Sequence, residues 1–167
     1  MLPLPMTAQQ CADEVIAPAF RLLLPSRFDS RDARVMLLAM ALQESGLGAR
    51  KQLGGPAMGL WQFEQGGGVR GVLNHPASRW YVRAVCLLRF VAPTESDLYH
   101  ALSHDDVLAA AIARLLLWTD PEPLSSEPRA ALACYLRTWR PGAYQRDPEG
   151  VTERFLRNFE IARRVYA

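Results

Sequence analysis

Residues 35–48 read VMLLAMALQESGLG, an apolar run that ends on a glutamate and is followed by two glycines. We expect a helix here that begins near Ser30, a residue type that caps helix N-termini, and ends near Ser45. Gly46 supplies the stop, because glycine readily adopts the left-handed conformation common just after helices. Since the eight residues Val35–Leu42 are apolar on every side, this helix is predicted to be central and buried.

Helical periodicity also dominates the rest of the chain. Thr7 with Gln10, and Ser103 with Asp106, have the spacing of capping boxes at two helix starts. Residues 47–68 are rich in glycine and lack a helical period, which predicts an irregular or small β region. The predicted fold class is therefore mainly α (α+β), with further helices over residues 7–24, 69–74, 77–91, 95–102, 103–118, 128–139 and 151–166.

The composition indicates one domain over residues 1–167. Half of the 167 residues are hydrophobic, which suits a single core of ordinary size. No apolar run approaches the 18 or more residues of a membrane span, so no integral membrane segment is expected. The net charge is only +2 and the arginines are dispersed among acidic residues, which argues against a nucleic-acid partner.

Other sequence features concern location and assembly. The first residues, MLPLPMTAQQ, have neither the basic region nor the long apolar segment of a secretory signal, so we expect synthesis in the cytoplasm. Cys11, Cys86 and Cys134 lie far apart in apolar surroundings, which predicts buried thiols rather than disulfides or metal ligands. No heptad pattern persists beyond one helix, so a monomer is expected.

Neither a metal site nor a cofactor is predicted. His100 and His104 are four residues apart, but they lack the glutamate that accompanies such a pair in zinc proteases. Residues 66–68 are three glycines without the Gly-Lys-Ser that follows in a phosphate-binding loop. They are expected to give mobility to the edge of a cleft.

Glu44 is the candidate catalytic residue, because two effects would raise the pKa of its carboxyl. Burial disfavours the charged form, and the negative end of the helix dipole disfavours it further. A carboxyl that stays protonated near neutral pH can donate its proton to a glycosidic oxygen. The alternative is an ordinary solvated glutamate at a helix end.

The residues around Glu44 resemble a known signature. ESGLG at 44–48, GPAMGLWQ at 55–62 and ALACYLRTWRPG at 131–142 are similar to three elements of the lysozyme-like lytic transglycosylases. Tyr135 matches the family tyrosine of the third element, whereas Leu136 replaces the family asparagine. The similarity extends over about residues 30–142, and it implies a lysozyme-like fold.

The resemblance implies one catalytic glutamate, Glu44, which protonates the bond between N-acetylmuramic acid and N-acetylglucosamine and later acts as a base. In that family the 6-hydroxyl of the sugar closes on the anomeric carbon, which gives an anhydro product. Glu64 is a candidate second carboxylate; if it faces Glu44, hydrolysis through water or a covalent intermediate becomes feasible. The alternative for Glu64 is a solvated turn residue.

Four further residues are candidates for substrate binding. Trp61 could pack against a sugar ring, or could equally be a core aromatic. Gln62 could pair with hydroxyl or acetamido groups. By resemblance, Tyr135 would orient the Glu44 carboxyl, although it could be an ordinary half-buried tyrosine. Ser45 adjoins the candidate catalyst and could be a substrate contact or merely a helix-end residue.

Three functional hypotheses follow. The first is a peptidoglycan-cleaving enzyme of the lytic transglycosylase or muramidase type, with glycan strands as its partner, from a phage or prophage. It would act at the cell wall after release or as a virion component. The second is a catalytically degenerate lysozyme-like module that binds glycan or serves as a phage structural part, which Leu136 keeps open. The third is an unrelated helical protein.

Overall fold

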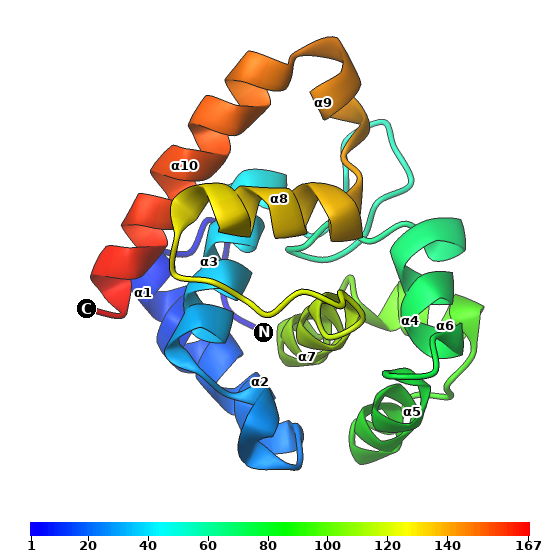
Figure 1. Ribbon diagram of the computed structural model, residues 1–167. Coiled ribbons are helices and arrows are strands. Elements are labelled where there is room, and N and C mark those ends of the chain that lie inside the picture. Colours follow the sequence, from blue (N-terminus) through cyan, green and yellow to red (C-terminus); the bar gives the residue numbers. More distant parts are fainter.

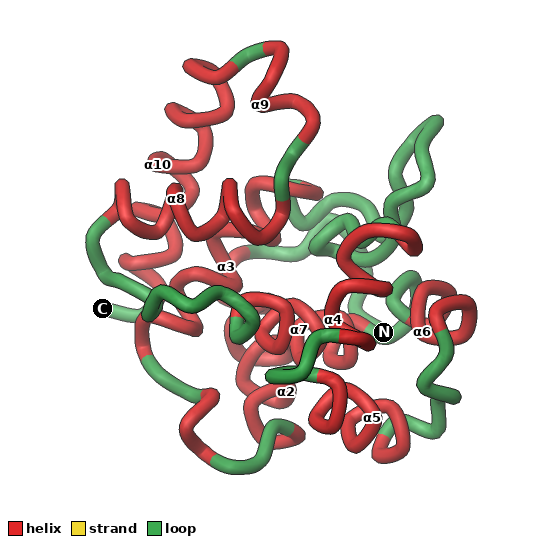
Figure 2. The backbone as a smooth tube through the Cα atoms, turned by 45° about the vertical axis from the view of Figure 1, so that its right-hand side comes forward, coloured by secondary structure: helices red, strands yellow, loops and turns green.

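The computed structural model describes residues 1–167. It consists of helices joined by loops and turns and contains no β-strand (Figures 1 and 2). The mainly helical fold class is confirmed. The predicted small β region is reduced to two isolated bridges, Lys51 with Met58 and Met58 with Phe63. The elements are α1 (Ala8–Cys11), η1 (Ala12–Ile16), α2 (Ala17–Leu22), η2 (Ser26–Phe28), α3 (Arg31–Ser45), η3 (Gln65–Val69), α4 (Arg70–Asn74), α5 (Arg79–Leu88), α6 (Glu95–Ala101), α7 (Asp106–Leu117), α8 (Pro128–Trp139), α9 (Gly142–Arg146) and α10 (Pro148–Val165).

Helix α3 has the boundaries and the burial that its sequence predicts. The Ser30 hydroxyl accepts a hydrogen bond from the backbone N–H of Ala33 at 3.1 Å and caps the first turn. Gly46 ends the helix in the left-handed conformation, with φ of 58°. All seven residues Val35–Ala41 are buried, so the apolar run forms the centre of the core rather than one side of an amphipathic helix.

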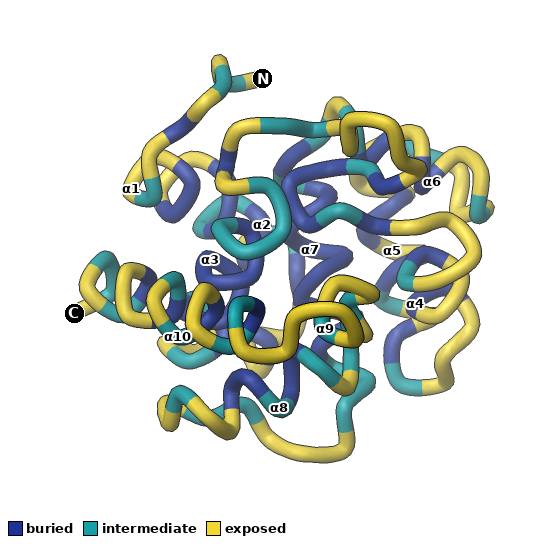
Figure 3. Tube along the Cα trace, turned by 90° about the horizontal axis from the view of Figure 1, so that it is seen from above, coloured by how far each residue is buried: buried dark blue, intermediate teal, exposed yellow.

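Helix α7 is a second core helix, and Figure 3 shows it and the middle of α3 in the dark blue of buried residues. Its predicted cap was wrong. The side chain of Asp105 accepts from the N–H of Leu108 at 2.9 Å, whereas the Ser103 hydroxyl donates to the carbonyl of His100. Asp105 directly precedes the first helical residue, so it occupies the capping position that the sequence pattern assigned to Ser103.

The other boundaries are close to those predicted, except at the C-terminus. The capping box of Thr7 and Gln10 is present at the start of α1, which continues through η1 and α2 to Leu22. Residues 140–150 were predicted as a break, but they contain α9 and the start of α10. The Asp147 carboxylate accepts from the N–H of Gly150 at 2.9 Å, which lets α10 begin at Pro148.

Helix α10 packs along α3 and supports its C-terminal half (Figure 1). The Asn158 amide donates to the Gln43 side chain at 3.0 Å. The ring of Phe155 stacks on that of Tyr135 in α8, with centroids 5.0 Å apart. These contacts hold α8 and the end of α3 in a fixed relative position, because aromatic pairs and buried hydrogen bonds restrict how the helices can slide.

The glycine-rich segment 46–64 is fastened to the core at three points. Arg50 makes a bidentate ion pair with Asp106 at the start of α7, with distances of 2.7 and 2.6 Å. The Ser45 hydroxyl donates to the carbonyl of Leu60 at 2.8 Å. Gly59 has φ of 77°, and a Cβ there would lie 2.7 Å from the carbonyl oxygen of Leu102. Only glycine fits this approach, so the segment is irregular but fixed.

The three cysteines are buried and free, as predicted. Burial raises the pKa of the Cys86 thiol to about 11. None of the helices combines the length and the apolar character required to cross a membrane.

Candidate active site

A groove of about 480 Å³ lies between the glycine-rich segment and the connection from α8 to α9. Glu44 lines it from the last turn of α3, and Gln62 and Glu64 line it from the segment that follows. The structure therefore brings three of the six predicted site residues into one cavity. Its volume is within the usual range for small-molecule sites.

Tyr135 contacts Glu44 from behind the groove. Its phenol hydroxyl donates to Oε1 of Glu44 at 2.6 Å, across a separation of 91 residues in sequence. Tyr135 is only 1% exposed and lies against Phe155, so its position is set by packing. The hydrogen bond fixes one carboxyl oxygen of Glu44 and leaves the other available to the groove.

The environment of Glu44 raises the pKa of its carboxyl to about 7. Burial is the main cause, because a low-dielectric surrounding disfavours the charged form. The hydrogen bond from Tyr135 acts in the opposite direction by stabilising the carboxylate. Burial likewise raises the pKa of the Tyr135 phenol well above its usual range, so this residue remains a hydrogen-bond donor.

Gln62 and Glu64 differ in how firmly the structure holds them. The Gln62 side chain donates from Nε2 to the carbonyl of Gly59 at 2.8 Å, and its backbone is in the left-handed region with φ of 50°. Strained non-glycine residues of this kind concentrate at functional sites. Glu64 is exposed, and its carboxylate makes no hydrogen bond or ion pair.

Trp61 does not face the groove. Its side chain has no exposed surface, and its Nε1 donates to the carbonyl of Leu37 at 2.9 Å. A fully buried ring cannot pack against a sugar, so the predicted sugar contact is wrong and the alternative of a core aromatic is correct. The indole instead seals the glycine-rich segment onto α3.

Ser45 also has a structural position. Its hydroxyl donates to the carbonyls of Ala41 and Leu60, at 3.1 and 2.8 Å, and accepts from the N–H of Leu47 at 3.3 Å. The side chain does not line the groove. It joins the end of α3 to the glycine-rich segment, so it positions the two elements that carry Glu44 and Gln62.

The sequence interpretation missed the opposite wall of the groove, which consists of Trp139, Arg140 and Arg146. The Trp139 Nε1 donates to the carbonyl of Trp61 at 2.9 Å, and its ring lies 5.2 Å from that of Phe63. Trp139 therefore offers the half-buried aromatic surface that Trp61 lacks. The four-residue spacing from Tyr135, which puts both on one side of α8, was the available signal.

A second groove, of about 840 Å³, adjoins the first and shares Glu64, Trp139 and Arg140 with it. Leu136 lines this second part, together with Asp120 and Arg137. Those last two residues form an ion pair at 2.8 Å. Together the two grooves present aromatic, amide and charged groups along their walls.

The arrangement can donate a proton from Glu44 to a group bound in the groove, and it can orient that group with Gln62 and Trp139. No three His, Cys, Asp or Glu side chains gather in a way that could hold a metal ion. Comparison of the chain with protein-family models, with curated proteins and with solved structures finds no match.

Proposed function

We propose that the protein cleaves the β-1,4 bond between N-acetylmuramic acid and N-acetylglucosamine in peptidoglycan, with Glu44 as general acid and then base. The observation that carries this proposal is the pair of Tyr135 and Glu44, joined at 2.6 Å beside the groove. The pair unites two of the three sequence elements that resemble lytic transglycosylases. A lysozyme-like fold belongs to the same proposal.

The chemistry begins with a protonated Glu44. With a pKa of about 7, a large fraction of the carboxyl carries its proton at neutral pH and can pass it to the glycosidic oxygen as the bond breaks. The resulting carboxylate, held by the Tyr135 hydroxyl, then accepts a proton from the attacking group. In the transglycosylase route this group is the 6-hydroxyl of the same sugar, and no second carboxylate is needed.

A hydrolytic muramidase is the variant of this proposal that uses Glu64. The exposed carboxylate of Glu64 lines the same groove and could activate a water molecule. The transglycosylase route has the better support, because no neighbouring group holds the Glu64 side chain in a defined orientation, and a general base needs such an orientation. In either case the protein would act at the cell wall, after release or as part of a virion.

A second candidate function is a glycan-binding or phage structural module without catalysis. Leu136 favours it, since an apolar side chain stands in the adjoining groove where the family has an asparagine. The two adjoining grooves, which share Trp139, would still bind sugars in that case.

The test incubates purified protein with peptidoglycan sacculi and analyses the released fragments by mass spectrometry. Wild type is compared with Glu44→Gln and with Glu153→Gln, an exposed glutamate on α10 that serves as the matched control. We expect anhydro-ended fragments from wild type and from the control, and none from Glu44→Gln.

Each other outcome selects an alternative. Fragments with reducing ends that disappear in Glu64→Gln would establish hydrolysis. Equal release by wild type and Glu44→Gln would remove Glu44 from the mechanism. Co-sedimentation with sacculi but no release by any variant would establish the binding module.

A further inference from the structure

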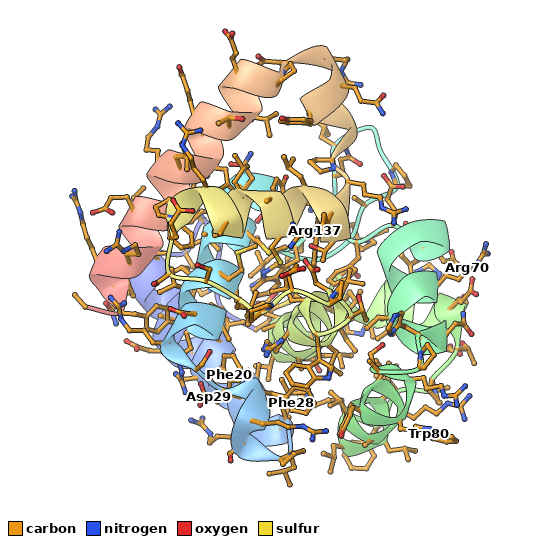
Figure 4. The ribbon with its side chains drawn as sticks, in the orientation of Figure 1. Phe20, Phe28, Asp29, Arg70, Trp80 and Arg137 are labelled. Carbon is orange, nitrogen blue, oxygen red and sulfur yellow. The ribbon has the colours of Figure 1, made fainter.

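Helix α5 exposes an apolar face that no other part of the chain covers. Trp80 and Leu87 are seven residues apart and lie on one stripe of the helix, opposite the buried Val82 and Val85. Figure 4 shows Trp80 at the outer edge of the molecule. The exposed fractions are 62% for Trp80, 68% for Leu87, 57% for Leu88 and 98% for Phe90, the residue that follows the helix end. We call these four residues the α5 face.

Phe90 occupies a backbone position that favours glycine. Its φ is 56°, in the left-handed region, and its N–H donates to the carbonyl of Leu87 at 3.1 Å. The N–H of Val91 donates to the carbonyl of Cys86 at 2.9 Å, which completes the hydrogen-bond pattern of a Schellman helix end. A bulky aromatic at this site is unfavourable for the backbone and, being almost fully exposed, adds nothing to the core. Such an exception at a helix end points to a role outside the fold.

The stretch of sequence that contains α5 carries only basic charge. Residues 65–94 contain four arginines and no acidic residue. Arg70 pairs with Glu95 and Arg89 with Asp105, whereas Arg79 and Arg83 make no ion pair. Both lie over the indole of Trp80, with guanidinium carbons 5.4 and 5.1 Å from the ring centroid. The exposed apolar side chains are therefore accompanied by two cations that have no acidic partner within the chain.

A second copy of the chain is a poor occupant for this face. A twofold contact would bring the α5 faces of both copies together, so Arg79 and Arg83 of one copy would approach the same arginines of the other and repel them. An anionic lipid surface accommodates both the exposed apolar side chains and the unpaired arginines. Aromatic and aliphatic side chains enter the headgroup boundary, and arginines beside them bind the negative headgroups.

We propose that the α5 face docks the protein reversibly on the surface of an anionic phospholipid membrane. Trp80, Leu87, Leu88 and Phe90 insert at the interface, and Arg79 and Arg83 contact the lipid phosphates. No residue of α5 lines the grooves around Glu44, so docking leaves the candidate active site open. The membrane proposal is independent of the reaction that the groove catalyses.

Binding is measured by co-sedimentation with vesicles of phosphatidylcholine alone and with vesicles that contain phosphatidylglycerol in equal amount. We expect binding to the mixed vesicles at low salt, little to phosphatidylcholine, and weakening as salt screens the arginines. Phe90→Gly should weaken partitioning about tenfold, because it removes one large inserted side chain. The same variant should not lower the melting temperature, since glycine relieves the backbone at this position.

Arg79→Gln with Arg83→Gln should weaken binding to the mixed vesicles about tenfold and leave the weak binding to phosphatidylcholine unchanged. The matched control is Leu53→Ser, which alters a fully exposed leucine outside the α5 face and should bind as wild type does. The proposal is overturned if wild type does not bind the mixed vesicles at low salt, or if Phe90→Gly binds them as well as wild type does. If wild type does not bind vesicles but forms a concentration-dependent dimer, and Phe90→Gly is monomeric, the α5 face is instead an interface with a second copy.

Discussion

Glu44 and Glu64 line the same groove, are 20 residues apart, and have opposite surroundings. Glu44 ends a buried helix and accepts a hydrogen bond from a tyrosine that is itself packed against α10. Glu64 follows the glycine-rich segment, is exposed, and has no side-chain partner. Identical side chains in one cavity can therefore have different tasks. Burial raises the pKa of the Glu44 carboxyl against the opposing effect of the Tyr135 hydrogen bond, and that hydrogen bond holds the carboxyl in one orientation.

The largest expected effect is on catalysis by Glu44→Gln. Glutamine keeps the acceptor for the Tyr135 hydroxyl but has no proton to donate, so the proposed activity should fall by about 10²–10⁴-fold. The rate of soluble fragment release from sacculi measures the loss. A fall of similar size in Glu64→Gln would abolish the distinction between the two glutamates.

The same substitution should stabilise the fold in alkaline conditions. A folded-state pKa of about 7 lies above the ordinary glutamate value, so folded Glu44 holds its proton longer than the unfolded chain does. Stability from this group is complete below about pH 4.5 and is lost as the pH rises to about 7. Glu44→Gln should therefore be more stable than wild type by about 3 kcal/mol at pH 8. At pH 4 the two should be equal, as measured by urea unfolding.

Tyr135→Phe tests the contrast between Glu44 and Glu64 by removing the hydrogen bond that only Glu44 accepts. It removes the hydrogen bond that lowers the Glu44 pKa, so the alkaline limb of the pH–rate profile should move to higher pH. Loss of orientation should reduce the maximal rate about tenfold, the cost of one hydrogen bond. Tyr81→Phe removes a hydroxyl that accepts a hydrogen bond from Arg27 away from the groove, and it should leave the profile unchanged. An unchanged profile in Tyr135→Phe would separate the tyrosine from the chemistry.

Glu64→Gln should have the smallest effect. An exposed carboxylate without partners contributes within about ±0.5 kcal/mol to stability, and the transglycosylase route does not use it. Mass analysis should find the same anhydro ends as in wild type. A switch in the fragment ends, or their loss, would instead assign Glu64 a part in the reaction.

Local signals in the sequence predicted much of the fold. Ser30, Thr7 and Gly46 mark helix ends through hydrogen bonds and backbone conformations that involve only a few neighbouring residues. The predicted cap of α7 was wrong, because Ser103 and Asp105 lie within three residues of each other and both have side chains that can cap a helix. Local patterns cannot decide such a competition, because the tertiary position of the chain determines where the first turn begins.

The sequence predicted the candidate site only in part. The full burial of Trp61, and the half-buried position of Trp139 in the groove wall, depend on how α8 crosses the end of α3. That crossing is set by contacts between residues far apart in sequence, such as Gln43 with Asn158. Tyr135 was predicted by resemblance, and the structure brings it to Glu44. Arg140 and Arg146 have no local signal that distinguishes them from the other arginines.

The contrast between Glu44 and Glu64 depends above all on whether Glu44 is protonated near neutral pH. A carbon-13 NMR titration of the glutamate side-chain carboxyls in the intact protein measures the pKa of Glu44 directly. The Glu44 resonance is assigned by its disappearance in Glu44→Gln. We predict a midpoint of about pH 7 for this resonance in wild type, and a higher one in Tyr135→Phe. A Glu44 midpoint of about 4.3, the value of an unperturbed glutamate, would contradict the account, because the carboxyl would then be ionised at the neutral pH where it has to donate a proton.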